Sequence, residues 1–137
     1  MYNWKFRPSN DPLVTVIVPM HNQEHNLSRL VANLRLQTVR NAQFLLIDDG
    51  STDHTFQVAQ ELINGDRRFE VHTKAHTGTG STRNYGMTRT HGRYLFFLDA
   101  DDQIAASGTL EMLCEVADRE DALVRSEERR VGKECRS

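Results

Sequence analysis

Three carboxylates, Asp99, Asp101 and Asp102, fall within four positions directly after the apolar run 95–98. In an extended chain Asp99 and Asp101 project to the same side, because side chains alternate with period two. Two anionic oxygens on one side could share a divalent cation, and clustered carboxylates repel one another unless a positive group compensates. The alternative is a solvated loop or a helix N-terminus, where aspartate is also favoured. These residues alone do not distinguish a metal site from a solvated loop or a helix N-terminus, so the patterns in the rest of the chain are needed.

Other polar clusters also follow apolar runs. Residues 13–19 are almost wholly apolar and lead into the polar stretch 21–24, and residues 44–47 lead into the acidic pair 48–49. Runs without a polar face are typical of strands that are buried on both sides, as in a parallel sheet covered by helices. By the same reasoning, we predict that the run 95–98 is a central strand.

Apolar residues at spacings of three and four lie between these runs and predict amphipathic helices. The clearest helix covers residues 27–37, and a glycine-rich turn at residues 77–80 leads into a helix of small residues that extends to about residue 90. We further predict a helix over residues 56–63, an edge strand over 69–73 and a helix over 110–116. Strand and helix therefore alternate, which predicts an α/β fold: an open, mostly parallel sheet with helices on both faces and right-handed crossovers. Ligands bind such sheets beyond the carboxyl ends of the strands, where the polar clusters lie.

The composition of the chain favours a soluble globular domain over a membrane protein or a small domain held together by disulfides or zinc. A chain of 137 residues with 38% hydrophobic and 26% charged residues is typical of a soluble globular domain. The run 13–20 is too short to span a membrane and contains Pro19, and the first ten residues lack a signal-peptide pattern. We therefore expect a cytoplasmic protein, with membrane association only through segments outside this chain. Cys114 and Cys135 have neither disulfide-framework nor zinc-site spacing.

The C-terminal stretch 125–137 abandons every pattern before it and resembles the translation of a short-read sequencing adapter. We accordingly expect residues 1–124 to be a partial natural domain and residues 125–137 to be a non-native tail. The tail holds five of the 17 Lys and Arg residues and three of the 19 Asp and Glu residues, which leaves a net charge of about −4 before it. A charged helical tail or nucleic-acid arm is the alternative. We predict no nucleic-acid partner.

Two classes of nucleotide site are disfavoured by the glycines. A dinucleotide enzyme needs Gly-x-Gly-x-x-Gly directly after the first strand, where this chain has Pro19-Met20-His21-Asn22. Gly78-x-Gly80 is a fragment of that pattern with Arg83 in place of the third glycine, and glycine-rich turns often serve backbone geometry alone. The sequence also contains no Gly-x-x-x-x-Gly-Lys-Ser/Thr, so a P-loop is excluded.

Four blocks carry a family resemblance: residues 16–22, 47–53, 83–86 and 98–102, which read VIVPMHN, IDDGSTD, RNYG and LDADD. In this order and at this spacing they resemble a family 2 glycosyltransferase with the Rossmann-like GT-A fold. The resemblance covers about residues 13–113. It implies a sheet of the kind predicted above and a donor site at its carboxyl edge.

The resemblance also implies roles for individual residues. It assigns nucleotide-sugar binding to Pro19, His21, Asn22, Glu24, Asp49, Arg83, Asp99 and Ala100, and metal binding to Asp101 and Asp99. In such enzymes the residue at Asp49 hydrogen-bonds the base, usually uracil, and the residue at Asp101 holds Mg²⁺ or Mn²⁺ on the diphosphate. Arg83 would face the diphosphate, and Asp99 would lie near the ribose or the donor sugar. A cation seated there would stabilise the charge that grows on the departing nucleoside diphosphate.

The implied activity is inverting transfer of a sugar from a nucleotide-diphospho-sugar, such as a UDP-sugar, to a glycan, lipid or polymer acceptor. The catalytic base of such enzymes is an acidic residue further along the chain, and Glu120-Asp121 comes too early for it. We read that dipeptide as helix surface. Two alternatives remain: a nucleotide-sugar-binding fragment without catalysis, and a nucleotidyltransferase, which would release pyrophosphate.

Several side chains have alternative interpretations. His21 and His25 have the spacing of paired metal ligands, but without a third convergent ligand such residues more often lie in a turn and on a helix surface, which is the interpretation we favour. Asp48 is predicted to tie loops together, while Asp53 is predicted to lie at a helix N-terminus. Arg83 either faces the diphosphate or lies on the surface of its helix.

Overall fold

The computed structural model describes residues 12–39 and 41–120 of the chain. The elements of this part are β1 (Val14–Met20), α1 (Leu27–Arg35), β2 (Ala42–Asp49), α2 (Thr55–Leu62), β3 (Phe69–Lys74), α3 (Thr79–Met87), β4 (Tyr94–Phe97) and α4 (Thr109–Arg119). The strands form one parallel sheet in the order β3-β2-β1-β4. The predicted α/β fold is therefore confirmed. The expected domain boundary at residue 124 and the tail 125–137 lie outside the described residues.

The centre of the sheet is the pair β1 and β2, whose register aligns Ile17 with Leu45 and Met20 with Asp48. β4 pairs with the other edge of β1 and ends at Phe97, which lies opposite Ile17. Because all pairs are parallel, the segments that follow the strands meet at one edge of the sheet. The polar clusters of the sequence lie at that edge.

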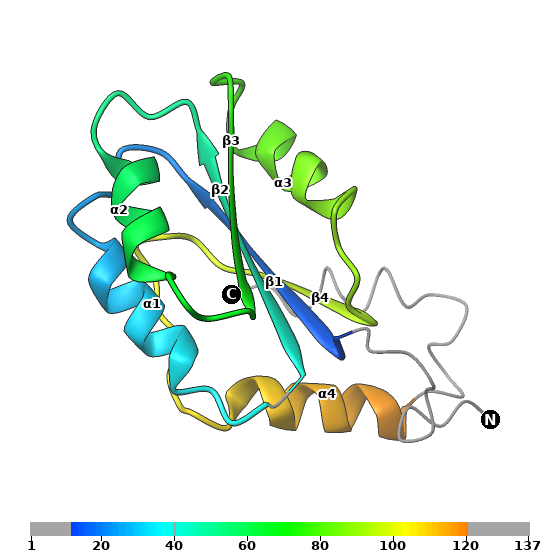
Figure 1. Ribbon diagram of the computed structural model, residues 1–137. Coiled ribbons are helices and arrows are strands. Elements are labelled where there is room, and N and C mark those ends of the chain that lie inside the picture. Colours follow the sequence, from blue (N-terminus) through cyan, green and yellow to red (C-terminus); the bar gives the residue numbers. More distant parts are fainter. Residues whose placement is uncertain (1–11, 40, 121–137) are drawn as a thin grey trace.

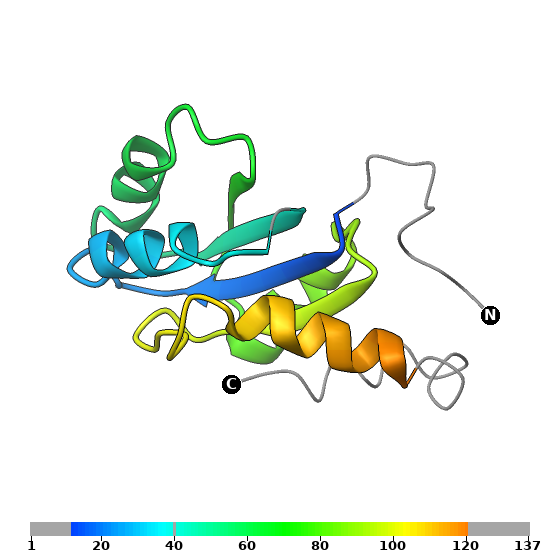
Figure 2. The same ribbon diagram turned by 90° about the horizontal axis from the view of Figure 1, so that it is seen from below.

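Helices cover both faces of the sheet, and Figure 1 shows α1 and α2 on one side of the strands and α3 on the other. One core contains Val16 and Leu46 of the sheet together with buried residues of α1, α2 and α4. The second core contains Ile17 and Ile47, against which Tyr85 and Met87 of α3 pack. Figure 2, in which the molecule is seen from below, shows α4 in front of the sheet. Both faces are therefore apolar, as the runs without a polar face predicted.

Helix α3 lies close to the sheet because of Gly86. A Cβ at this position would lie 2.7 Å from Ile47 Cδ1 and 2.8 Å from Ile17 Cγ2, both closer than side chains tolerate. The missing side chain lets the helix backbone rest on the two isoleucines. This contact sets how closely the last turn of α3 packs on the sheet.

Some predicted boundaries differ from the structure. β3 lies at an edge as predicted, but β4 is also an edge strand in the described part of the chain, where we expected a central one. Leu95 and Phe97 face the α3 side, whereas Tyr94 and Phe96 belong to the core on the opposite side. An apolar run indicates that both faces of a strand are covered by helices. It does not indicate how many strands pair with it. Helix α3 also ends earlier than expected, at residue 87.

The remaining predictions on composition can be compared in part. Cys114 belongs to α4 and is buried in the core, and Cys135 lies outside the described residues. None of the helices described has the length and apolar character needed to cross a membrane.

Candidate functional site

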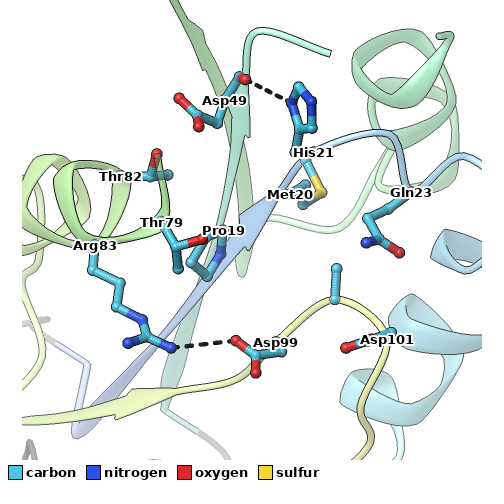
Figure 3. A pocket seen from close by; sticks show the side chains of 11 residues that line it. Pro19, Met20, His21, Gln23, Asp49, Thr79, Thr82, Arg83, Asp99 and Asp101 are labelled. Carbon is cyan, nitrogen blue, oxygen red and sulfur yellow. Dashed lines mark hydrogen bonds and ion pairs between the residues drawn. The ribbon is translucent and has the colours of Figure 1, made fainter. Parts of the chain in front are cut away.

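A cavity of about 340 Å³ opens at the carboxyl edge of the sheet (Figure 3). Its wall comes from the end of β1, the end of β2, the first turns of α3 and the segment after β4. The lining residues are Pro19, Met20, His21, Gln23, Asp49, Thr79, Thr82, Arg83, Asp99, Ala100 and Asp101. The volume lies within the range of small-molecule sites, and its polar side chains come from segments far apart in the sequence.

The structure brings together most of the residues that the sequence proposed. Those that line the cavity are Pro19, His21, Asp49, Arg83, Asp99, Ala100 and Asp101. Asn22 and Glu24 do not line it. Among the lining residues that sequence reasoning missed are Gln23, Thr79 and Thr82. Gln23 belongs to the polar stretch 21–24 that follows the first apolar run, but Thr79 and Thr82 carry no signal beyond their position in a helix of small residues.

Asn22 ties the loop after β1 to the loop after β2. Its backbone has φ 54°, a left-handed conformation that asparagine tolerates. Its Oδ1 accepts hydrogen bonds from Thr52 N at 2.9 Å and Asp53 N at 3.3 Å, and its own N–H donates to Ser51 Oγ at 2.9 Å. Asn22 therefore supports the cavity wall without lining it.

Glu24 belongs to a separate surface cluster. Its Oε2 accepts a hydrogen bond from His54 N at 3.3 Å and lies 3.4 Å from His54 Nδ1. His25 Nε2 lies 3.8 Å from Glu24 Oε1, and the His25 side chain is 95% exposed. His21 and His25 therefore do not form a shared metal site, and His25 is the surface residue that the favoured interpretation expected.

The carboxylates Asp48 and Asp53 both hold loops in place. Asp48 Oδ1 accepts hydrogen bonds from the backbone N–H and the hydroxyl of Ser51, and its Oδ2 accepts one from Thr73 Oγ1 at 2.9 Å. Asp53 Oδ1 accepts one from Thr55 N at 2.9 Å at the start of α2. Burial raises the pKa of Asp53, but hydrogen bonds from Thr55 and Glu24 lower it by more, so that it lies below its usual range.

Asp49 is the most enclosed carboxylate of the site, with a side chain that is 5% exposed. Its Oδ1 accepts hydrogen bonds from Lys74 Nζ at 2.8 Å and Thr77 N at 2.9 Å, and its Oδ2 accepts one from Gly78 N at 2.9 Å. Burial raises the pKa of Asp49, but these hydrogen bonds lower it by more and leave it far below its usual range. Asp49 is therefore ionised, and it holds the N-terminal end of α3, where a negative charge is favoured.

Lys74 completes this arrangement from the end of β3. Its side chain is 14% exposed, and besides Asp49 its Nζ donates to Ala75 O at 2.9 Å and to Thr77 Oγ1. No local pattern marks Lys74 as a partner of Asp49, because the two lie 25 positions apart and meet only through the register of β2 and β3. The glycine-rich turn was visible in the sequence, but the carboxylate that it binds was not.

Two histidines stack above the end of β2. The rings of His21 and His76 have centroids 4.3 Å apart and planes inclined by 27°. Both Nδ1 atoms lie near Asp49 O, at 3.0 Å from His21 and 3.1 Å from His76, and His76 Nδ1 also lies 2.9 Å from Asp49 Oδ2. Because a carbonyl oxygen only accepts, these contacts require a proton on Nδ1 of His21. The Nε2 of His21 then accepts from Asn22 Nδ2 at 3.4 Å.

The acidic cluster after β4 lies at the other end of the cavity. The chain is not extended there, because Asp102 N donates to Asp99 O at 3.0 Å and closes a turn. The condition for Asp99 and Asp101 to alternate to one side, an extended chain, is therefore not met. Carboxylate oxygens of Asp99, Asp101 and Asp102 nevertheless lie within 4.8 Å of one another. Arg83 Nη2 donates to Asp99 Oδ1 at 3.3 Å (Figure 3). Its Nε is buried and has no hydrogen-bond partner among the described residues.

Two groups of side chains have ligand atoms close enough for one metal ion: the acidic cluster after β4, and His21, Asp49 and His76. The second group is a poor site, since Lys74 Nζ already lies on Asp49 and the two rings stack rather than converge. The acidic cluster offers carboxylates, and Asp99 is half-exposed while Asp101 is exposed. Mg²⁺ and Mn²⁺ prefer such oxygen ligands, and Mg²⁺ in particular keeps part of its water shell. The donor set therefore fits these cations.

Comparison with known proteins identifies the family. The family model of glycosyl transferase family 2 matches residues 15–133. The chain belongs to glycosyl transferase family 2. An uncharacterized glycosyltransferase of Haemophilus influenzae is 36% identical over 97 residues, which cover 70% of this chain and 39% of that protein. The uncharacterized glycosyltransferase EpsJ of Bacillus subtilis is 33% identical over 79% of this chain and 31% of its own length. This family 2 chain therefore spans only a third or so of the length of these relatives.

Two solved structures share the fold of this chain. Residues 1–349 of S. aureus TarS in complex with UDP-GlcNAc have a TM-score of 0.71 and 27% identity, covering 78% of this chain and 31% of the other. The mannosyltransferase PcManGT from Pyrobaculum calidifontis, in complex with GDP-Man and Mn²⁺, has a TM-score of 0.72 and 21% identity over 85% of this chain and 36% of its own. The second likeness shows a shared fold. Both are proteins with the GT-A type of sheet described above.

Proposed function

We propose that this chain provides the donor site of an inverting glycosyltransferase, which transfers a sugar from a UDP-sugar to a glycan, lipid or polymer acceptor. The observation that carries the proposal is that one cavity has both groups in its wall: His21 and Asp49 lie at one end, and Asp99 and Asp101 lie at the other. That arrangement matches a ligand with a flat aromatic group at one end and charged phosphates at the other. The UDP-GlcNAc complex of TarS supports a uridine donor.

At the base end, His21 offers a ring face and Asp49 a buried carboxylate that stays ionised. A carboxylate accepts the N–H of a base, and an imidazole ring stacks on its plane. Pro19 adds an apolar wall beside them. We assign base recognition to these three residues, with Asn22 and Glu24 outside the contact surface.

At the phosphate end, Asp101 and Asp99 would hold Mg²⁺ or Mn²⁺, with Ala100 between them in the wall. The bound cation would supply positive charge to the leaving nucleoside diphosphate. Arg83 lies beside Asp99 at the cavity wall, and its guanidinium can donate to a phosphate oxygen. The Mn²⁺ in the PcManGT complex supports a metal in this fold.

The described residues provide the donor half of the reaction only. We place the catalytic base and the acceptor site in the portion of the family's length that this chain does not span. The second candidate is a fragment that binds the nucleotide-sugar without catalysing transfer. The observation in its favour is that the chain covers only 39% and 31% of two relatives. Release of UDP from UDP-GlcNAc would support transfer, and binding without release would support the second candidate. The cytoplasmic location remains a prediction.

Calorimetric titration of UDP into the full chain, with and without Mn²⁺, tests the proposal. We expect binding that depends on Mn²⁺, and an Asp101→Asn variant that weakens it about tenfold or more, the equivalent of one hydrogen bond to a charged group. The matched control is Glu120→Gln, which removes an exposed charge at the end of α4. Equal weakening by both substitutions would remove Asp101 from the site, and metal-independent binding would exclude the metal role.

A further inference from the structure

His76 makes the two contacts that the proposed base site offers to a nucleobase. Its ring stacks on His21 at a centroid separation of 4.3 Å, and its Nδ1 lies 2.9 Å from Asp49 Oδ2. A base bound between the same two groups would stack on His21 and donate an N–H to Asp49. The His76 side chain therefore occupies the position proposed for the nucleobase, with its ring on His21 and its N–H beside the Asp49 carboxylate.

While His76 is in place, its Nδ1 donates to Asp49 O at 3.1 Å and lies 2.9 Å from Asp49 Oδ2, where a base would bind. A carboxylate offers about four lone-pair positions, two on each oxygen. Oδ1 accepts from Lys74 Nζ and Thr77 N, while Oδ2 is in contact with Gly78 N and His76 Nδ1. A base N–H that approaches Oδ2 beside Gly78 N therefore has to displace the His76 ring.

His76 is the donor that can leave at the smallest cost. The donors from Thr77 and Gly78 are backbone groups at the start of α3, and Lys74 is 14% exposed and bound to two further oxygens. The side chain of His76 is 59% exposed. Exposed side chains change rotamer readily, so that the ring can turn to solvent while the carboxylate keeps its other three donors.

The backbone of His76 stays in place during such a movement because it rests on Gly50. A Cβ on Gly50 would lie 2.6 Å from His76 N and 3.1 Å from His76 Cα. This packing fixes where the His76 side chain begins. The displacement is therefore a side-chain rotation about a fixed backbone and not a movement of the whole loop.

We infer that the His76 side chain competes with the nucleobase of the donor for the His21 ring and the Asp49 carboxylate, so that donor binding turns His76 out of the site. The inference rests on the proposed function and adds to it a residue that sets donor affinity. His76 lowers the affinity for nucleotides by the free energy needed to displace it. It has no such effect on a ligand that occupies the phosphate end alone.

The test compares His76→Ala with the unsubstituted full chain in calorimetric titrations with UDP and with pyrophosphate, both in Mn²⁺. We expect about tenfold tighter UDP binding by the variant, the equivalent of one charge-assisted hydrogen bond, and unchanged pyrophosphate binding. His76→Asn keeps a donor but loses the ring, and we expect a smaller gain. The control is His72→Ala, which removes a histidine of β3 whose Nε2 lies 3.4 Å from Glu70. Circular dichroism establishes that each variant is folded.

The outcomes separate this inference from the function beneath it. Unchanged UDP affinity in the folded His76→Ala and His76→Asn variants would overturn the inference. Weaker UDP binding would overturn it as well and would make His76 a partner of the base. An equal gain in pyrophosphate affinity would show a general electrostatic effect and not competition at the base end. If the unsubstituted chain bound neither UDP nor pyrophosphate, the proposed function would fail, and the inference with it.

Discussion

Two acidic clusters at the same edge of the sheet differ in how their charge is balanced. Asp48 and Asp49 at the end of β2 are buried and surrounded by donors from Ser51, Thr73 and Lys74 and from the backbone of the β3–α3 segment. The cluster after β4 is open: Asp101 and Asp102 are exposed and form no ion pair within the described residues. The first cluster is balanced by the protein, and the second is available to a cation from outside.

The difference shows that a local pattern does not decide the role of an aspartate. Both clusters follow a buried apolar run, and each contains two adjacent aspartates. The residues that neutralise Asp49 lie 25 to 29 positions further along the chain and arrive through the pairing of β2 with β3. β4 has no second neighbouring strand in the described residues, so that no comparable segment covers Asp101.

The largest expected effect is on stability, and it separates the two clusters directly. Asp49→Asn leaves Lys74 without its buried counter-charge, which we expect to lower the free energy of unfolding by about 3 kcal/mol. Asp101→Asn removes an exposed charge, and we expect a change within about 0.5 kcal/mol. Urea unfolding monitored by circular dichroism measures both. Similar losses in the two variants would contradict the distinction between a balanced and an open cluster.

A smaller effect on stability is expected at Gly50, which packs against the backbone of His76 beside the balanced cluster. Gly50 has φ +62°, and an added Cβ would lie 2.6 Å from His76 N. We expect Gly50→Ala to cost about 2 kcal/mol through the left-handed backbone conformation and the clash together. The matched control is Gly65→Ala, where φ is +87° but no atom lies within 4 Å of the added Cβ. If both variants lost the same free energy of unfolding, the clash with His76 would make no contribution to the loss at Gly50.

The smallest expected effect is a dependence of stability on pH that belongs to the balanced cluster. Burial raises the pKa of Asp49 in the folded chain, but hydrogen bonds outweigh burial and hold this pKa below its usual range. The pKa values of two aspartates outside the cluster are lowered too: burial raises the pKa of Asp53, but hydrogen bonds from Thr55 lower it by more, and hydrogen bonds from Arg68 lower the pKa of Asp66. Unfolded aspartates bind protons near pH 3.9, so the unfolded state takes up more protons on acidification. Stability should be fully present above about pH 5 and should fall as the pH is lowered toward 2. Urea midpoints measured at several pH values test this, and Asp49→Asn should show a shallower decline. The same slope in both proteins would exclude Asp49 as a contributor.

The fold could be predicted because its signals are local. Apolar runs marked the strands, spacings of three and four marked the helices, and parallel topology then placed the polar clusters at one edge. The turn at Asp99 to Asp102 was predicted only as the alternative of a solvated loop, because it contains no glycine or proline, the strongest local signals of a turn. Its closing hydrogen bond runs from Asp102 N to Asp99 O.

The site could be predicted less completely, for a physical reason. Pro19 and Asp49 lie at the ends of β1 and β2, and His21 follows β1 directly. Strand pattern placed these ends at the carboxyl edge of the sheet, and the family resemblance assigned the three residues to the donor site. The roles of Lys74 and His76 depend on contacts with residues at least 25 positions away, which no local pattern encodes. Asn22 sits between two cavity residues in sequence but turns into the neighbouring loop through its left-handed backbone.

The hydrogen bonds of Asn22 have a consequence for the thermodynamics of binding. They join the loop after β1 to the loop after β2 at Thr52 and Asp53, so that both loops lose their conformational freedom when the chain folds. A ligand that contacts His21 therefore meets a wall that is already ordered, and the entropy lost on association is confined to the ligand and a few side chains. The backbone of the wall around His21 is preorganised, so that rearrangement on binding is left to side chains such as His76 and to the ligand.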